Sequence, residues 1–348
     1  MCALGLIGVM ATSAQAQSDA VQRTPHGDPD ISGMFTFRTI TPLERPSQFA
    51  DQETLDAETA AAFEASERTR QNRDLFDPES GAPSAGYQSR AEGGVLSYNE
   101  FWYERGVDLT DDKRTSLVID PPNGRQPPRT AEAQAALAGL AASFRPNTGT
   151  AWWLEDGLNA PGPYDDMEIR PAAERCLLGF GSTAGPPMLP VLYNNLKRIV
   201  QTEDTILIQV EMVHEARVIR MNDEHAPPEI SSWLGDSVGR WEGDTLVVDT
   251  TNFSDSPALS GASRNLHVVE RFTRLDNDTL LYNFTVNDPT VWTAPWTGEY
   301  IWPASDTRVY EYACHEANYA LEGIMKGARL LEAEARGEET GGVVNPTR

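Results

Sequence analysis

The stretch that decides the fold is GRWEGDTLVVDTTNF, residues 239–253. It predicts a β-hairpin, in which two β-prone segments are joined by a tight turn around Gly243. Glycine beside an acidic residue supplies the positive backbone angle that such a turn needs. The same Asp-Thr pair, followed by an apolar and β-prone run, begins at Asp204, Asp278 and Asp306. This recurrence predicts a β-meander built from successive hairpins.

Nine segments in the second half of the chain have the length and the β-branched content of strands. They are Leu196–Gln201, Thr205–Val213, Ala216–Met221, Ser237–Glu242, Thr245–Thr251, His267–Leu275, Thr279–Asn287, Gly298–Trp302 and Arg308–Cys314. Because turns join most of them, and because closure removes exposed sheet edges, we expect a mainly β fold in which an antiparallel β-meander closes into a lipocalin-like barrel.

Composition divides the rest of the chain. We expect a signal peptide at 1–16, a helix- and loop-rich N-terminal region at 17–185, the antiparallel β-barrel at 186–315, a C-terminal helix at 316–336 and a disordered tail at 337–348. The signal peptide is expected because an apolar run is followed by small residues at Ala14 and Ala16, the pattern that a signal peptidase reads. The protein should therefore be periplasmic or secreted.

Two helices are expected in the N-terminal region, at 56–73 and 130–143. Asp56 and Thr130 are suitable residues to cap them. The aromatic cluster Tyr98–Tyr103 is more typical of a core than of a ligand platform. The C-terminal helix has one apolar side, so we expect it to pack against the barrel or to plug one end.

The net charge of −24 on 348 residues limits the partners. A surface this acidic repels nucleic acid and anionic lipid, which excludes both as partners. No segment after the signal peptide approaches a transmembrane helix, so no membrane insertion is expected. A small-molecule substrate is expected instead, and the sequence leaves the oligomeric state open.

Several common catalytic motifs are missing from the sequence. It contains no glycine-rich nucleotide loop, Walker motif, G-x-S-x-G elbow or HExxH helix. These absences exclude the usual dehydrogenases, phosphoryl-transfer enzymes, α/β-hydrolases and zinc proteases. No cofactor is expected.

The mature chain keeps two cysteines, Cys176 and Cys314. An even number in an oxidising compartment favours a disulfide between them. Two free buried thiols, or a nucleophilic Cys314 beside His315, are the alternatives.

Three of the five histidines, His214, His267 and His315, lie in or at the ends of expected strands. His26 and His225 lie in polar segments, where we expect them to be solvated. Alternation along 205–221 places His214 in an apolar row, so it should point into the barrel. A histidine in such a row is more often a hydrogen-bonded core residue than a catalyst, but barrels of this size commonly enclose a ligand cavity.

A carboxylate and an aromatic hydroxyl are expected to share that interior. The apolar face of 279–288 carries Tyr282 and directs Asp288 inward near the end of the strand. An inward carboxylate beside an inward imidazole is the simplest general acid/base pair. The alternative is a structural ion pair of Asp288 with Arg271 or Arg217. The histidines also suggest a metal site, but they lack the short spacing of many such sites, so no metal is expected.

Six blocks of the mature chain resemble a family of secreted bacterial proteins of unassigned function. They are Pro29–Gly33, Thr41–Pro46, Tyr98–Trp102, Gly185–Pro190, Gly239–Phe253 and Tyr312–Glu316. The resemblance covers nearly the whole mature chain and implies export and a single family unit. It supplies no catalytic residue. The hairpin-rich half is also similar to lipocalins, an analogy of fold only.

These observations lead to one functional expectation and two alternatives. We expect a cofactor-independent lyase or isomerase that uses histidine general acid/base chemistry in the barrel pocket. Its substrate would be a small aromatic or sugar-derived molecule, for example a plant-polymer fragment that undergoes ether elimination. His214 or His267 would be the base, and His315 or Asp288 would be its acid or orienting partner. Tyr282 would donate a hydrogen bond, and Arg271 would stabilise the negative charge that develops. The alternatives are a non-catalytic carrier of an apolar ligand and a metal-dependent hydrolase with histidine ligands.

Overall fold

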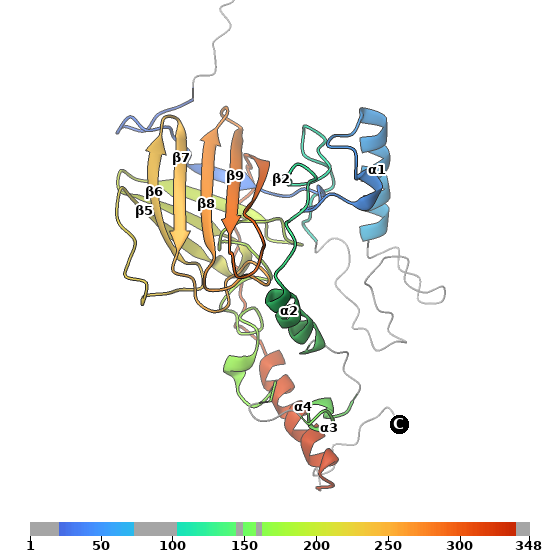
Figure 1. Cartoon of the computed structure of the whole chain (residues 1–348). Helices are drawn as coiled ribbons and strands as arrows, with labels where there is room; N and C mark the ends of the chain where they lie inside the picture. Colours follow the sequence, from blue (N-terminus) through green and yellow to red (C-terminus); the bar gives the residue numbers. More distant parts are fainter. Residues whose placement is uncertain (1–20, 73–102, 144–148, 158–161, 339–348) are drawn as a thin grey trace, which may run out of the picture.

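The predicted hairpin lies at the centre of one curved sheet (Figure 1). The computed structural model describes residues 21–72, 103–143, 149–157 and 162–338. Within them the strands pair in the order β1-β3-β4-β5-β6-β7-β8-β9-β10-β2. The strands are β1 Gly33–Thr36, β2 Val118–Asp120, β3 Leu196–Gln201, β4 Thr205–Val210, β5 Ala216–Met221, β6 Asp236–Glu242, β7 Thr245–Thr251, β8 His267–Arg274, β9 Thr279–Asn287 and β10 Trp296–Pro303. The α-helices are α1 Ala57–Gln71, α2 Ala131–Ser143, α3 Trp152–Glu155 and α4 Ala320–Ala335.

Three expectations from the sequence fall wholly or partly outside the described residues. The signal peptide at 1–16 lies outside them, as do residues 98–102 of the aromatic cluster and 339–348 of the expected tail. The two N-terminal helices lie where the sequence predicts them. Asp56 caps α1 by accepting a hydrogen bond from the Thr59 N–H at 2.8 Å.

The mainly β fold is confirmed, but the barrel is open. In the described part of the chain, β1 pairs along its length with β3 and β2 pairs with β10, so the two end strands do not form a ladder with each other. β1 instead approaches the end of β10, through an antiparallel bridge between Phe35 and Ala304. Beside it, the Ser305 N–H donates to the Met34 carbonyl at 2.9 Å. The sheet is therefore a half-barrel, and the expected closure is wrong.

The meander also contains one parallel pair. β5 and β6 run in the same direction, with Ile219 opposite Ser237 and Met221 opposite Gly239. A parallel connection must return along the sheet before the next strand begins. Residues 222–235 make this return, and they carry His225 with them.

The last expected strand, Arg308–Cys314, does not form. β10 pairs with β9 on one side and with β2 on the other, so this segment does not continue the sheet beside β10. The C-terminal helix α4 also differs from expectation, because it packs against α3 rather than against the sheet. The Trp153 Nε1–H donates to Glu332 of α4 at 2.8 Å, and Ala328 packs in the same cluster.

A kink after β4 changes the direction of the side chains that follow. Residues Met212–His214 form a 3₁₀ turn in which Val213 has a φ of 56°. Because side chains alternate along a strand, an irregularity of this kind moves the next residues to the other face. Arg217 is consequently buried and Val218 is exposed, the reverse of the alternation expected from the sequence.

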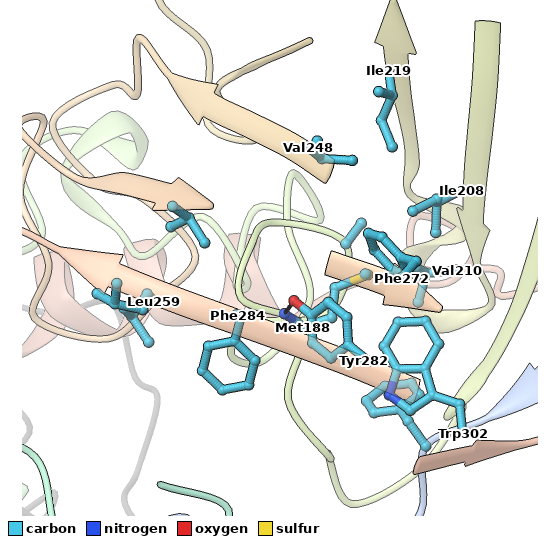
Figure 2. Close-up of a cluster of buried hydrophobic side chains, with 14 of the residues drawn as sticks. Met188, Ile208, Val210, Ile219, Val248, Leu259, Phe272, Tyr282, Phe284 and Trp302 are labelled. Atoms are coloured by element: carbon cyan, nitrogen blue, oxygen red, sulfur yellow. Dashed lines mark hydrogen bonds between the residues drawn. The ribbon is translucent and has the colours of Figure 1, made fainter. Parts of the chain in front are cut away.

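The concave face of the sheet surrounds an irregular segment, 179–188, which we call the plug. Met188 at its end is fully buried among aromatic side chains (Figure 2). Its N–H donates to the Tyr282 hydroxyl at 2.8 Å, and its carbonyl accepts from the Tyr300 hydroxyl at 2.8 Å. Burial holds the pKa of both tyrosines well above the ordinary value. Sheet side chains therefore satisfy the backbone of the plug.

Charged side chains hold the other end of the plug. Glu215 accepts from the N–H groups of Gly179 and Ala184 at 2.6 and 2.9 Å. The Lys197 ammonium donates to the Thr183 carbonyl at 2.6 Å and lies 3.7 Å from the centre of the Phe37 ring. Burial lowers the pKa of Lys197 well below its ordinary value. The plug and its partners occupy the interior where the sequence predicts a ligand.

A buried ion pair lies beside the plug. The Arg217 guanidinium donates to both oxygens of Glu270, at 2.7 and 3.0 Å. The Tyr282 hydroxyl also donates to Glu270, at 2.8 Å. A bidentate pair with a further hydrogen bond is the arrangement in which burial of two charges is tolerated.

The expected disulfide is present. Cys176 and Cys314 are joined with a Cα–Cα distance of 5.9 Å, across 138 positions of the sequence. The link ties the segment before the plug to the segment before α4.

We predict that Gly243→Val destabilises the protein through backbone strain alone. Gly243 has a φ of 63°, and a Cβ added there would meet nothing within 4 Å. A β-branched residue in this conformation should cost about 1–3 kcal/mol. Gly243→Asn is the matched control, because asparagine tolerates positive φ. Urea unfolding of the two variants should show a larger loss for valine. Equal loss would show that the turn does not depend on its backbone angle.

We also predict that reduction of the disulfide lowers the free energy of unfolding by about 2–5 kcal/mol, since the link restricts a long loop in the unfolded chain. Urea unfolding with and without reductant measures this difference. The Cys176→Ser/Cys314→Ser protein is the control and should be insensitive to reductant. Wild-type midpoints that coincide under the two conditions would contradict the prediction.

Candidate functional site

A row of polar side chains crosses the outer face of β5 to β8. Asp236, Asp249 and His267 belong to β6, β7 and β8, and each is followed in the sequence by a buried residue. Strand alternation therefore places these three side chains on the face opposite the plug. The fourth member, His225, comes from the connection 222–235.

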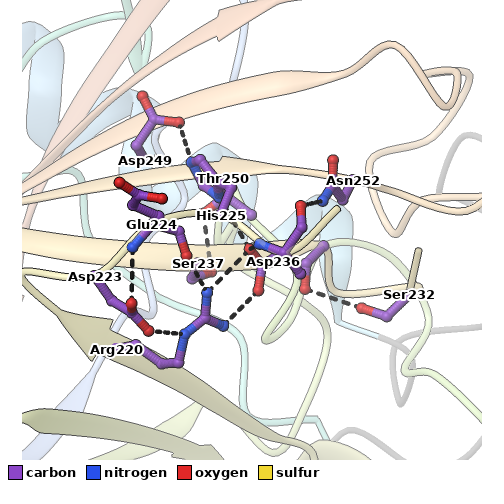
Figure 3. A network of polar contacts seen from close by, with 12 residues as sticks. Arg220, Asp223, Glu224, His225, Ser232, Asp236, Ser237, Asp249, Thr250 and Asn252 are labelled. Atoms are coloured by element: carbon purple, nitrogen blue, oxygen red, sulfur yellow. Dashed lines mark hydrogen bonds and ion pairs between the residues drawn. The ribbon is translucent and has the colours of Figure 1, made fainter. Parts of the chain in front are cut away.

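Two imidazoles share one carboxylate at the middle of this row. The Nε2 atom of His267 lies 3.0 Å from Asp249 Oδ2, and the Nε2 atom of His225 lies 3.0 Å from Asp249 Oδ1. The other ring nitrogen of His225, Nδ1, lies 3.0 Å from Asp236 Oδ2. Figure 3 shows His225 between the two carboxylates. The row Asp236–His225–Asp249–His267 is called the His/Asp array below.

Arg220 fixes one end of the array. It donates to Asp236 at 2.6 Å, to Asp223 at 2.7 Å and to the Glu224 carbonyl at 2.7 Å (Figure 3). Partial burial opposes ionisation of Asp236, but the hydrogen bonds from Arg220, the Ala226 N–H and His225 outweigh it and lower the pKa to about 2. Asp236 is therefore a carboxylate at neutral pH.

The backbone of the His225 loop is held in place from β7. Asn252, which follows β7 and has a φ of 57°, donates through its side chain to the Ala226 carbonyl at 2.9 Å. Its own carbonyl accepts from the Ser232 N–H at 3.0 Å. Both contacts join the loop to the strand that carries Asp249, so the position of His225 relative to Asp249 is set by the backbone.

The two histidines of the array differ in what they are able to do. Both ring nitrogens of His225 are engaged, because each lies 3.0 Å from a carboxylate oxygen. His267 contacts the array through Nε2 alone, and its Nδ1 has no hydrogen-bond partner among the described residues. The hydrogen bond to Asp249 raises the pKa of His267 above its ordinary value and lowers the pKa of Asp249. With 38% of its side chain exposed, the ring of His267 is accessible to solvent.

The other predicted histidines do not join His267. His214 follows the kink at Val213, so its side chain is exposed and its Nδ1 lies 3.2 Å from the Tyr312 carbonyl. The expectation that it points into the barrel is wrong. His315 is exposed as well, in the turn that follows the disulfide.

The remaining predicted site residues have structural partners. Asp288 is buried, as expected, but it accepts from the Ser263 N–H at 2.7 Å and from the Thr290 hydroxyl at 2.6 Å. Tyr282 is occupied by the plug and Glu270. Arg271 lies on the outer face, where it donates to Glu242 at 3.2 Å. The structure does not bring these residues together with His214 or His267.

Sequence reasoning missed three members of the array, and His225 was wrongly expected to be solvated. A signal was present for Asp249, which interrupts the apolar run of the hairpin at an outward position. His225 gave no local signal, because its partners come from the two strands that follow the loop.

No group of three or more histidine, cysteine or acidic side chains in the described ranges is arranged to hold a metal ion. No helix in the same ranges is long and apolar enough to cross a bilayer. The sequence matches no protein-family model and no curated protein.

We predict that Asp249→Asn shifts the titration of His267 to lower pH. In the wild type the midpoint should lie above the ordinary histidine value of about 6.5, because ionised Asp249 stabilises the imidazolium. An NMR titration of the imidazole signals measures both midpoints. Asp244→Asn, which removes an exposed carboxylate paired with Arg23, is the control and should leave the midpoint unchanged.

Because of the contact between His267 and Asp249, the loss of stability caused by Asp249→Asn should depend on pH. The raised pKa of His267 means that the pair stabilises the fold fully below about pH 6.5 and that this contribution is lost as pH rises through the raised value. The lowered pKa of Asp249 removes the contribution again in acid. Asp249→Asn should therefore destabilise the protein more near pH 5.5 than near pH 9. The opposite order would contradict the assignment.

Proposed function

We propose that this protein is a cofactor-independent lyase or isomerase of the periplasm or extracellular space, with His267 as its general base and acid. The observation that carries the proposal is the contact of His267 Nε2 with Asp249 at 3.0 Å, which leaves Nδ1 without a partner in the described residues. The signal-peptide pattern at 1–16 and the disulfide support export.

A carboxylate on one ring nitrogen prepares the other for proton transfer. It holds the ring in one orientation and stabilises the imidazolium that forms when the ring accepts a proton. General bases work best when their pKa lies near the operating pH. The raised pKa of His267 is compatible with this role, and its exposure gives a substrate access to Nδ1.

His225 has a different role in this proposal. Both of its nitrogens contact carboxylates, so it has no proton to give away without loss of a contact. It instead holds Asp249 in place beside His267, through its contact with the second oxygen of that carboxylate.

The surface next to His267 favours a hydroxylated substrate. Asn287 of β9 is the register partner of His267, and the next residues on the same outward face, Thr285 and Asn283, contact Thr297 and Glu299 of β10. Amide and hydroxyl groups recognise hydroxyls through hydrogen bonds. Of the two substrate classes expected from the sequence, the sugar-derived class fits this surface better than the aromatic class.

The proposed reaction is an elimination. His267 Nδ1 accepts a proton from a carbon next to a carbonyl or carboxylate group of the substrate. The electron pair of the broken C–H bond forms a carbon–carbon double bond, and the neighbouring C–O bond breaks with its electrons on oxygen. The leaving oxygen takes a proton from the His267 imidazolium, which restores the enzyme. An isomerase would instead return the proton to a different carbon.

We predict that His267→Gln lowers turnover by about 10²–10⁴-fold, because glutamine keeps a hydrogen-bonding group but transfers no proton. The assay uses a panel of uronic-acid glycosides and sugar ethers, with double-bond formation followed by absorbance and by NMR in D₂O. His214→Gln is the matched control, since that exposed ring lies outside the array.

The pH profile distinguishes catalysis from a purely structural contact. If neutral His267 is the base, turnover rises with pH through its pKa, and Asp249→Asn moves this rise to lower pH. Folded His267→Gln protein with wild-type turnover would remove His267 from the reaction. Absence of turnover across the panel would contradict the proposed substrate class.

A further inference from the structure

A second site lies away from the His/Asp array, between the plug and the N-terminal region. It is a cavity of about 760 Å³. The plug side of its wall comes from 180–182 and 189–193, and the opposite side includes residues from 39–43 and 126–129. Cavities of about 300–1,000 Å³ are typical of small-molecule sites.

The charge of this cavity is opposite to that of the protein. The charged side chains in its described lining are Arg105 and Arg129, and no carboxylate lines it. The whole chain has 52 acidic and 28 basic residues. The charged residues among its described lining are therefore all basic, whereas the chain as a whole is acidic. The cavity favours a negatively charged ligand.

Arg129 is held rigidly but has no polar partner. Its guanidinium carbon lies 5.3 Å from the centre of the Trp292 ring. On another side it packs against Gly261, where an added Cβ would lie 2.5 Å from Nη1. None of its nitrogens has a hydrogen bond or an ion pair in the described part of the chain. A fixed guanidinium without an acidic partner is well prepared to bind a carboxylate.

The rest of the wall is mainly apolar. Leu189 and Met212 contribute to it, together with Phe180 and Leu192, which are 56% and 50% exposed. Ser182 also lines the cavity, and its buried hydroxyl oxygen has no partner. Large apolar side chains that remain exposed around a cavity are a common feature of ligand sites.

We propose that this cavity binds a small carboxylate with an apolar body, and that Arg129 binds the carboxylate group. The apolar wall accommodates the body, and the Arg129 guanidinium provides the charge that the carboxylate requires. This site is independent of the proposed elimination at His267. If the protein is a carrier, this cavity is where the apolar ligand would bind.

Calorimetric titration with dodecanoate and dodecanol tests the site, with both ligands kept below their aggregation limits. The two chains differ only in the charged group. The wild type should bind dodecanoate at least about tenfold more tightly than dodecanol. Arg129→Gln should remove this preference and leave dodecanol binding unchanged. Arg125→Gln is the matched control, because Arg125 is exposed and lies outside the cavity lining.

A second variant protects the test against misfolding of Arg129→Gln. Leu192 is half exposed, so Leu192→Glu should fold, and its carboxylate should weaken dodecanoate binding more than dodecanol binding. Equal affinity for the two chains, no binding of either, or full dodecanoate affinity in Arg129→Gln would each overturn the proposal. His267→Gln should bind dodecanoate like the wild type, which separates this site from the elimination site.

Discussion

The structure depends on a requirement of the plug, whose backbone polar groups lie inside the half-barrel and must all be hydrogen-bonded. Strand side chains that point inward, Lys197, Tyr282 and Tyr300, meet part of this requirement, and Glu215 from the turn before β5 meets another part. The concave face is consequently committed to holding the plug. Groups that remain able to exchange protons with solvent lie on the other face of the same strands.

The two faces are coupled through β8. Glu270 points inward to Arg217 and Tyr282, and His267, three positions earlier, points outward to Asp249. A shift of one position in the pairing of β8 would exchange these faces and place an imidazole in the core and an unpaired carboxylate outside. The ion pair inside the sheet therefore fixes the orientation of the histidine outside it. The register of β8 therefore determines both the ion pair in the interior and the geometry of the array.

The sequence predicts regular structure well here and irregular structure poorly. The hairpin around Gly243 depends on local turn chemistry, and the observed bounds of β3, β7 and β9 equal those predicted from the sequence. The kink at Val213 depends on tertiary contacts, since nothing local marks a valine for positive φ. Together with the positive φ of His214, this kink reverses the faces of β5, and with it the expected role of His214. The array was not predicted for a related reason: His225 lies in a loop that returns over the sheet, so its contacts depend on tertiary structure.

The position of the disulfide has a topological consequence. Cys176 and Cys314 close a covalent ring that contains the plug and strands β3 to β10, while β1 and β2 remain outside it. The two strands outside the ring are also the two ends of the sheet. A protease that cuts a connection inside the ring leaves one covalent molecule with its central strands still tethered. A cut between β2 and Cys176 instead separates the N-terminal region from the ring, and this region is then held by non-covalent contacts, among them the pairing of β1 and β2 with the sheet.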